Sequence, residues 1–151
     1  MVLSGSLFLP GKVKTDYIEK DMISSKYILN ILDLLLDGDE KGKALRCQID
    51  YLTDIEYDYT GVGLYVSFKP SDGIEKYRYQ EEKIILDGVS ITSTELGIGA
   101  SATIFVRDGI IKTLEIWSYD GEYPRKELNN YKLKQEGTFG AGREISINSD
   151  N

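Results

Sequence analysis

The first regular feature along the chain is an apolar stripe with the spacing of an α-helix. Its residues recur every three or four positions and are Tyr27, Ile28, Ile31, Leu32, Leu35 and Leu36. Ser24 or Ser25 precedes the stripe as a candidate N-cap, and Gly38 follows it as a candidate helix stop. A second stripe that ends at Leu52 predicts a shorter helix over 43–52, so we expect a helical hairpin.

After residue 52 the apolar period changes from near 3.6 to two, which is typical of β-strands. Alternating runs lie at 55–59, 64–68, 83–86, 89–94, 100–107 and 110–118, with weaker candidates at 74–79, 131–135 and 144–147. The dipeptides Asp87-Gly88 and Asp108-Gly109 each separate two neighbouring runs by two residues. This spacing predicts two hairpins with type I′ turns.

The second hairpin defines two faces if Arg107 lies opposite Ile110. Glu115 then faces Ala102 and shares a face with Trp117, either at the rim of the sheet or buried with a basic partner. Both faces are largely apolar in this register. Such a hairpin is expected to have helices on one face and loops or another chain on the other.

The order of the elements predicts one α+β domain over 1–136. Its N-terminal helical hairpin should pack on a largely antiparallel, hairpin-rich sheet. A total length of 151 residues suits a single domain. The remaining stretch, 137–151, is polar and interrupted by Gly137, Gly140 and Gly142, so we expect a tail with one short strand.

The composition removes whole classes of chemistry. The chain has no His and a single Cys, which excludes His-based catalysis, Cys-rich zinc sites and an internal disulfide. No S-x-x-K box is present and no carboxylate pair stands out, so we predict no catalytic residue, no metal site and no cofactor. The lone Cys47 suits a reducing compartment, and we expect a cytoplasmic protein.

Hydropathy and charge indicate the kind of partner. The apolar residues Leu7 to Leu9 are interrupted by Pro10 and Gly11 and follow no basic segment, so we predict no signal peptide. No apolar stretch approaches the ~20 residues of a membrane span. With 25 acidic and 18 basic residues the net charge is −7, which disfavours nucleic acid and favours a basic protein.

Carboxylates and aromatic side chains gather in two stretches of the sequence. The first stretch lies in the run at 55–59, and the second follows the run at 110–118. Tyr and Trp supply contact area in protein interfaces, and acidic fields speed association with basic proteins. The predicted partner-binding residues are Asp54, Glu56, Tyr57, Asp58, Tyr59, Trp117, Tyr119, Asp120, Glu122 and Tyr123.

Several short motifs occur in a fixed order between residues 28 and 133. They are Leu34-Leu35-Leu36-Asp37-Gly38, Ala44-Leu45-Arg46-Cys47-Gln48-Ile49, Tyr59-Thr60-Gly61-Val62-Gly63, Gly99-Ala100, Val106-Arg107-Asp108-Gly109, Leu114-Glu115-Ile116-Trp117 and Gly121-Glu122-Tyr123-Pro124. Together they resemble a group of small bacterial proteins, some of which resemble immunity proteins of polymorphic toxin systems. The resemblance implies an α+β domain with a helical hairpin on an antiparallel sheet, and it carries over no catalytic residue.

The leading hypothesis is therefore a non-enzymatic protein-binding domain, specifically an immunity protein that neutralises a basic toxin. One alternative is a small-ligand-binding domain or a hydrolase with a pocket near Glu115 and Trp117. Another is a protein that forms homodimers through an exposed strand edge.

Overall fold

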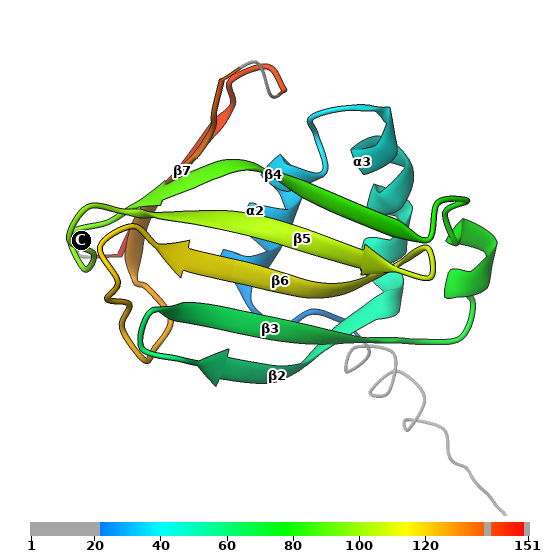
Figure 1. Cartoon of the computed structure of the whole chain (residues 1–151), viewed down its shortest axis with the longest axis horizontal. Coiled ribbons are helices and arrows are strands. Elements are labelled where there is room, and N and C mark those ends of the chain that lie inside the picture. The colour runs from blue at the N-terminus through cyan, green and yellow to red at the C-terminus, as the bar shows by residue number, and fades with distance from the viewer. Residues whose placement is uncertain (1–21, 138–139, 150–151) are drawn as a thin grey trace, which may run out of the picture.

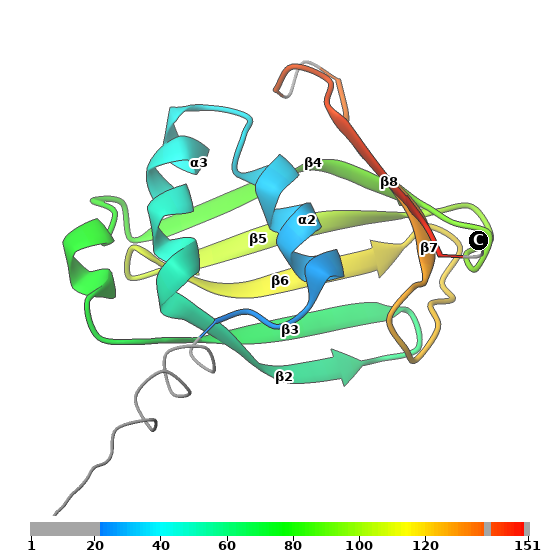
Figure 2. The same ribbon diagram turned by 180° about the vertical axis from the view of Figure 1, so that it is seen from behind.

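The structure is a computed structural model that describes residues 22–137 and 140–149 (Figure 1). Within those ranges a seven-stranded antiparallel sheet forms one layer, and the helices gather against one of its faces (Figure 2). The predicted α+β class and antiparallel sheet are confirmed. The N-terminal stretch, in which the sequence predicts no signal peptide, lies outside the described residues.

Among the described residues, three of the four helical elements precede the strands, and the fourth lies between two strands. The helical elements are α2 (Lys26–Leu35), α3 (Glu40–Leu45) and the 3-10 helices η1 (Arg46–Tyr51) and η2 (Ile74–Tyr77). The strands are β2 (Leu52–Tyr59), β3 (Gly63–Pro70), β4 (Lys83–Thr92), β5 (Ala100–Arg107), β6 (Ile110–Ser118), β7 (Asn130–Gln135) and β8 (Glu144–Asn148). Their order in the sheet is β2-β3-β6-β5-β4-β7-β8, and every neighbouring pair is antiparallel.

Helix α2 forms where the sequence predicts it. The Ser25 hydroxyl accepts a hydrogen bond from the backbone N–H of Ile28 at 3.1 Å, which satisfies a donor that the first turn leaves unpaired. The predicted apolar stripe is buried, and the helix packs against β4, β5 and β7. Each fully buried aliphatic side chain contributes about 1.5–3 kcal/mol, so this stripe anchors the helix to the sheet.

The second helical segment differs from the prediction. The Asp39 carboxylate caps α3 by accepting the backbone N–H of Gly42 at 2.9 Å, and the chain tightens into η1 from Arg46 onward. Helix α3 contacts chiefly η1, its own continuation, whereas α2 contacts the sheet. A helical hairpin packed as one unit on the sheet is therefore not confirmed.

The β5–β6 hairpin has the predicted turn. Asp108 and Gly109 both adopt positive φ values, 56° and 74°, as a type I′ turn requires. Arg107 pairs with Ile110, as expected.

The faces predicted for β6 are wrong beyond a bulge near the start of this strand. The bulge shifts the pairing by one residue, so Glu115 lies opposite Thr103 instead of Ala102. Ile116 consequently points into the core, whereas Glu115 and Trp117 point away from it. The outer face of the hairpin is thus largely polar rather than apolar.

Strand β4 runs through the position of a predicted hairpin turn. Asp87-Gly88 lies in a bulge between Leu86 and Val89, and Gly88 adopts a φ of 111°. The predicted hairpin is wrong because β5 offers a continuous edge along which β4 can keep pairing. The strand candidate at 74–79 is also wrong, since η2 forms there.

The strands predicted near the C-terminus are confirmed as β7 and β8. The buried Gln135 side chain donates to the Leu34 carbonyl at 3.0 Å and accepts the Arg143 backbone N–H at 2.9 Å. The Arg143 guanidinium contacts the carboxylates of Asp33 and Asp37 at 3.0 and 2.8 Å. These bonds hold the β7–β8 hairpin against α2.

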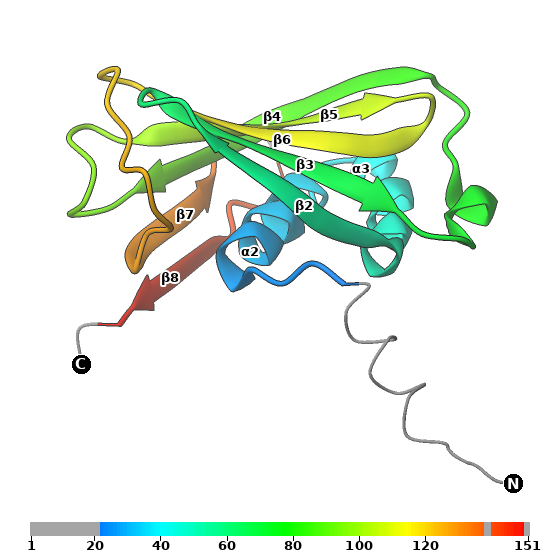
Figure 3. The same ribbon diagram turned by 90° about the horizontal axis from the view of Figure 1, so that it is seen from below.

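The sheet has two unlike faces. The hydrophobic core lies between the sheet and the helical layer, and β7 and β8 curl toward α2 (Figure 3). No described element covers the opposite face, which we call the open face (Figures 1 and 3). Large exposed side chains on it include Tyr65, Ile85 and Trp117.

Gln48 is a fully buried polar residue that joins separate segments. Its Nε2 donates to the carbonyls of Tyr77 and Gly109 at 2.9 and 2.8 Å, and its Oε1 accepts the Ile111 N–H at 2.9 Å. One amide thus ties η1 to the end of η2 and to the β5–β6 turn.

Gln48→Leu should lower the free energy of unfolding by about 3 kcal/mol, because buried backbone groups that lose a partner cost about 1–3 kcal/mol each. Urea denaturation measures this difference. Gln80→Leu at an exposed position is the matched control and should change stability by less than about 0.5 kcal/mol. Equal stability of Gln48→Leu and the wild type would contradict the role of Gln48.

Candidate functional site

A bulge in β2 divides the first acidic and Tyr-rich stretch between the two faces of the sheet. Ile55 is the extra residue in the pairing with β3. Asp54 therefore lies on the covered face together with Tyr57 and Tyr59, whose rings stack with their centroids 6.5 Å apart. All three are partly buried.

Asp54 ties β2 to the segment before α2. Its carboxylate accepts hydrogen bonds from the Ser24 N–H at 3.0 Å, the Ser24 hydroxyl at 2.9 Å and the Tyr57 hydroxyl at 2.6 Å. Burial raises the pKa of this carboxyl, but the hydrogen bonds from Tyr57 and Ser24 outweigh it, and the pKa falls below its usual value. Burial and the neighbouring Asp54 raise the pKa of Tyr57.

Tyr123 belongs to the interior, although the sequence places it among the partner-binding residues. Only 5% of the residue is exposed, and its hydroxyl lies 2.8 Å from that of Tyr27. The Tyr27 ring packs on Tyr131, and the Ser25 hydroxyl donates to Glu127 at 2.8 Å. Tyr123 therefore anchors its loop to the core. Its predicted contact with a partner stays a prediction.

The carboxylates that alternate with these tyrosines lie on the open face. Glu56 and Asp58 are exposed there, and Tyr65 stands between Asp58 on β2 and Glu115 on β6. The Tyr65 hydroxyl donates to Oε2 of Glu115 at 2.9 Å, and this bond raises the pKa of Tyr65. The residues predicted from the sequence to bind a partner do not include Tyr65. The alternation of side chains along the strand could have predicted its outward position, because its neighbours Leu64 and Val66 point to the core.

Trp117 is the largest aromatic side chain on this face and is 52% exposed. Its neighbours across the sheet are Gly63 on β3 and Ser101 on β5, so neither neighbouring strand covers the indole with a large side chain. A Cβ at Gly63 would lie 2.0 Å from the Ile116 carbonyl oxygen. Glycine is therefore required beside Trp117.

The loops at this end of the sheet are joined by backbone hydrogen bonds. The N–H of Ser118 donates to the Val62 carbonyl, that of Tyr119 to the Gly99 carbonyl and that of Tyr123 to the Gly61 carbonyl, at 2.9–3.0 Å. Asp120 accepts hydrogen bonds from the Ser118 hydroxyl and the Glu122 N–H, and these lower the pKa of its carboxyl. Tyr119 is 53% exposed, and the hydrogen bond from its N–H to Gly99 fixes its backbone in this scaffold.

The structure places acidic and aromatic side chains on the open face of β2, β3 and β6 and in the loop that follows β6. We call these side chains the Trp117 surface. Glu56, Asp58, Tyr65, Glu115 and Trp117 belong to its sheet part, and Tyr119, Asp120 and Glu122 belong to the loop that follows β6. A region of this kind can accept cationic side chains between its carboxylates and stack them on its rings. Asp54, Tyr57, Tyr59 and Tyr123 lie outside it.

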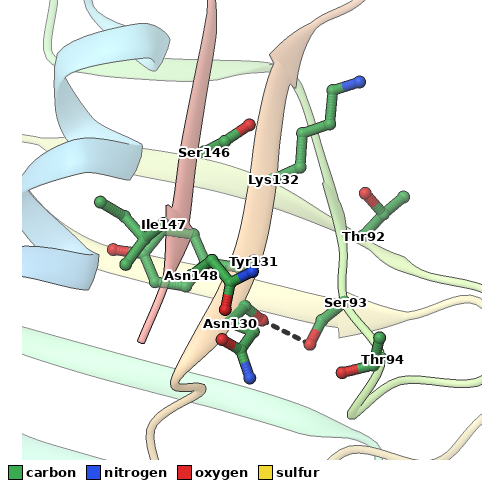
Figure 4. A pocket seen from close by; sticks show the side chains of 9 residues that line it. All are labelled: Thr92, Ser93, Thr94, Asn130, Tyr131, Lys132, Ser146, Ile147 and Asn148. Atoms are coloured by element: carbon green, nitrogen blue, oxygen red, sulfur yellow. Dashed lines mark hydrogen bonds between the residues drawn. The ribbon is translucent and has the colours of Figure 1, made fainter. Parts of the chain in front are cut away.

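Four hollows in the described surface have volumes of about 290–600 Å³, and none of the four is lined by Glu115 or Trp117. Figure 4 shows one of about 450 Å³ between β4, β7 and β8, with polar side chains such as Thr92, Lys132 and Ser146 around it. Another, of about 410 Å³, includes Glu122 in its wall at the loop end of the sheet.

The described residues contain no group of three or more Cys, Asp or Glu side chains placed to hold a metal ion. Nor is any helix within 22–137 or 140–149 long and apolar enough to cross a membrane.

No protein-family model, curated protein or solved structure matches the chain.

Asp54→Asn should make the fold less sensitive to acid. Because the folded-state pKa of Asp54 lies below the unfolded value of about 3.9, the charged carboxyl stabilises the fold above that pH. The contribution is lost as the pH falls through the folded-state pKa. Thermal unfolding should show a lower Tm for Asp54→Asn at neutral pH and a difference that shrinks in acid.

Asp58→Asn is the matched control, since it removes an exposed carboxyl from the other face of the same strand. It should leave the pH profile of Tm close to that of the wild type. If the difference in Tm between Asp54→Asn and the wild type stays constant with pH, Asp54 acts through its shape rather than its charge.

Proposed function

We propose that the protein binds a basic protein partner through the Trp117 surface. The observation that carries the proposal is an exposed Trp117 and Tyr65 set among carboxylates on a sheet face that no described element covers. Trp and Tyr are over-represented among the side chains that dominate binding energy in protein interfaces. Carboxylates around them attract lysine and arginine and repel acidic competitors.

The apolar part of the contact area continues across the sheet. Ile85 on β4 is exposed and pairs with Phe105 on β5, which in turn lies opposite Thr113 on β6. A partner that covers Trp117 would therefore extend its footprint over β3, β6, β5 and β4. The carboxylates lie toward β2 and the loop end, so basic groups of the partner belong at that side.

A basic toxin is the member of this partner class that the sequence motifs favour, through their resemblance to immunity proteins. Neutralising a toxin requires tight binding and no catalysis, and the net charge of −7 would speed the encounter with a cationic domain. We place this interaction in the cytoplasm, where the unpaired and exposed Cys47 would remain reduced.

The small-ligand or hydrolase alternative has less support. It requires a pocket at Glu115 and Trp117, and neither residue lines any of the four hollows described above. A sheet face without a deep pocket suits a macromolecular partner better than a small molecule.

Binding of a short poly-L-lysine to the Trp117 surface should change the fluorescence emission of the exposed indole. The signal reports on Trp117 alone, because it is the only Trp in the chain. We expect the triple variant Glu56→Gln, Asp58→Asn, Glu115→Gln to weaken this binding about tenfold, since exposed charge pairs contribute about 0.2–1 kcal/mol each. Fluorescence titration at low ionic strength measures the dissociation constants.

The matched control is Glu40→Gln, Asp50→Asn, Asp72→Asn, which neutralises equally many exposed carboxylates away from the open face. It should bind nearly as well as the wild type. Equal weakening in both triple variants would mean that only the net charge matters, and it would reject the Trp117 surface.

A further inference from the structure

The two edges of the sheet are protected unequally. Strand β2 carries a bulge at Ile55 and the carboxylates of Glu56 and Asp58, features that discourage another strand from pairing. Strand β8 has no bulge, Pro or Lys, and no described strand pairs with its outer edge. Its sequence, Glu-Ile-Ser-Ile-Asn, is centred on Ser146.

The pairing with β7 determines which backbone groups of β8 face outward. The Gln135 N–H donates to the Arg143 carbonyl at 3.0 Å, so alternate residues from Arg143 onward direct their backbone groups toward β7. The backbone groups of Glu144 and Ser146 therefore point to the outer edge. These positions can exchange hydrogen bonds with a further antiparallel strand.

A second copy of β8 fits this edge in a register centred on Ser146. Ser146 then lies opposite Ser146 of the second copy, and both direct their backbone N–H and C=O groups across the interface. Ile145 faces Ile147 of the second copy, which keeps apolar residues together on the covered face. Glu144 faces Asn148 of the second copy, so no like charges oppose each other.

Side-chain burial supports the same register. Ile145 and Ile147 pack against the core but remain partly exposed, and a second β8 would cover them further. A register centred on Ile145 would instead place Arg143 opposite Ile147 of the second copy.

We infer that two copies of the chain form a twofold-symmetric dimer through β8, in which one sheet continues across both copies. The paired edge is short, so the dimer is weak and forms reversibly at high protein concentration. The inference is independent of the proposed function, because β6, which carries Trp117, is separated from β8 by three strands.

Sedimentation velocity over a range of concentrations tests the dimer. The wild type should shift from monomer to dimer as its concentration rises. Ser146→Pro should stay monomeric with a little-changed Tm, because it removes an N–H that β7 does not use and Pro is tolerated at sheet edges. The matched control Ser146→Ala keeps the N–H and should dimerise like the wild type.

Cross-linking provides a second test that does not depend on the stability of Ser146→Pro. Opposed residues in a hydrogen-bonded antiparallel pair have Cα atoms about 5.5 Å apart, which a disulfide can bridge. In a Cys47→Ser background, Ser146→Cys treated with diamide should form a covalent dimer much faster than Thr92→Cys, an exposed control on β4. A monomer at every concentration, or equal cross-linking of both variants, would overturn the inference.

Discussion

Helix α2 packs against only one face of the sheet, and this one-sided contact divides the molecule into a core and an open face. The apolar stripe of the helix meets the inward residues of β4, β5 and β7, and this contact defines the core. The opposite residues of the same strands then have no described layer to pack against. Polar groups, carboxylates and a few aromatic rings occupy those positions, so a one-sided core produces the face on which we place binding.

Bulges decide which side chains belong to which face. The bulge at Ile55 keeps Asp54 on the covered side, where its hydrogen bonds connect β2 to the start of α2. The bulge near the start of β6 turns Glu115 and Trp117 outward. Without these single extra residues the acidic and aromatic side chains would be divided differently between core and solvent, because the side-chain period of a strand is two.

Features encoded by neighbouring residues could be predicted from the sequence. The α2 stripe with its Ser25 cap, the Asp108-Gly109 turn and the last two strands are of this kind. The bulges and the uninterrupted course of β4 could not be predicted, because they depend on which distant strand supplies the pairing edge. The burial of Tyr123 likewise depends on Tyr27, a partner far away in the chain, so the sequence alone assigned it to the surface.

The central claim, that the open face is the binding face, is tested most directly by NMR of the protein with ¹³C-labelled Tyr rings and a ¹⁵N-labelled indole. A lysine-rich polypeptide is added in steps while the aromatic and indole resonances are recorded. We expect the signals of Trp117 and Tyr65 to move together and saturate, whereas those of the buried Tyr27 and Tyr123 stay in place. Shifts confined to tyrosines of the covered side, with an unmoved Trp117 signal, would contradict it.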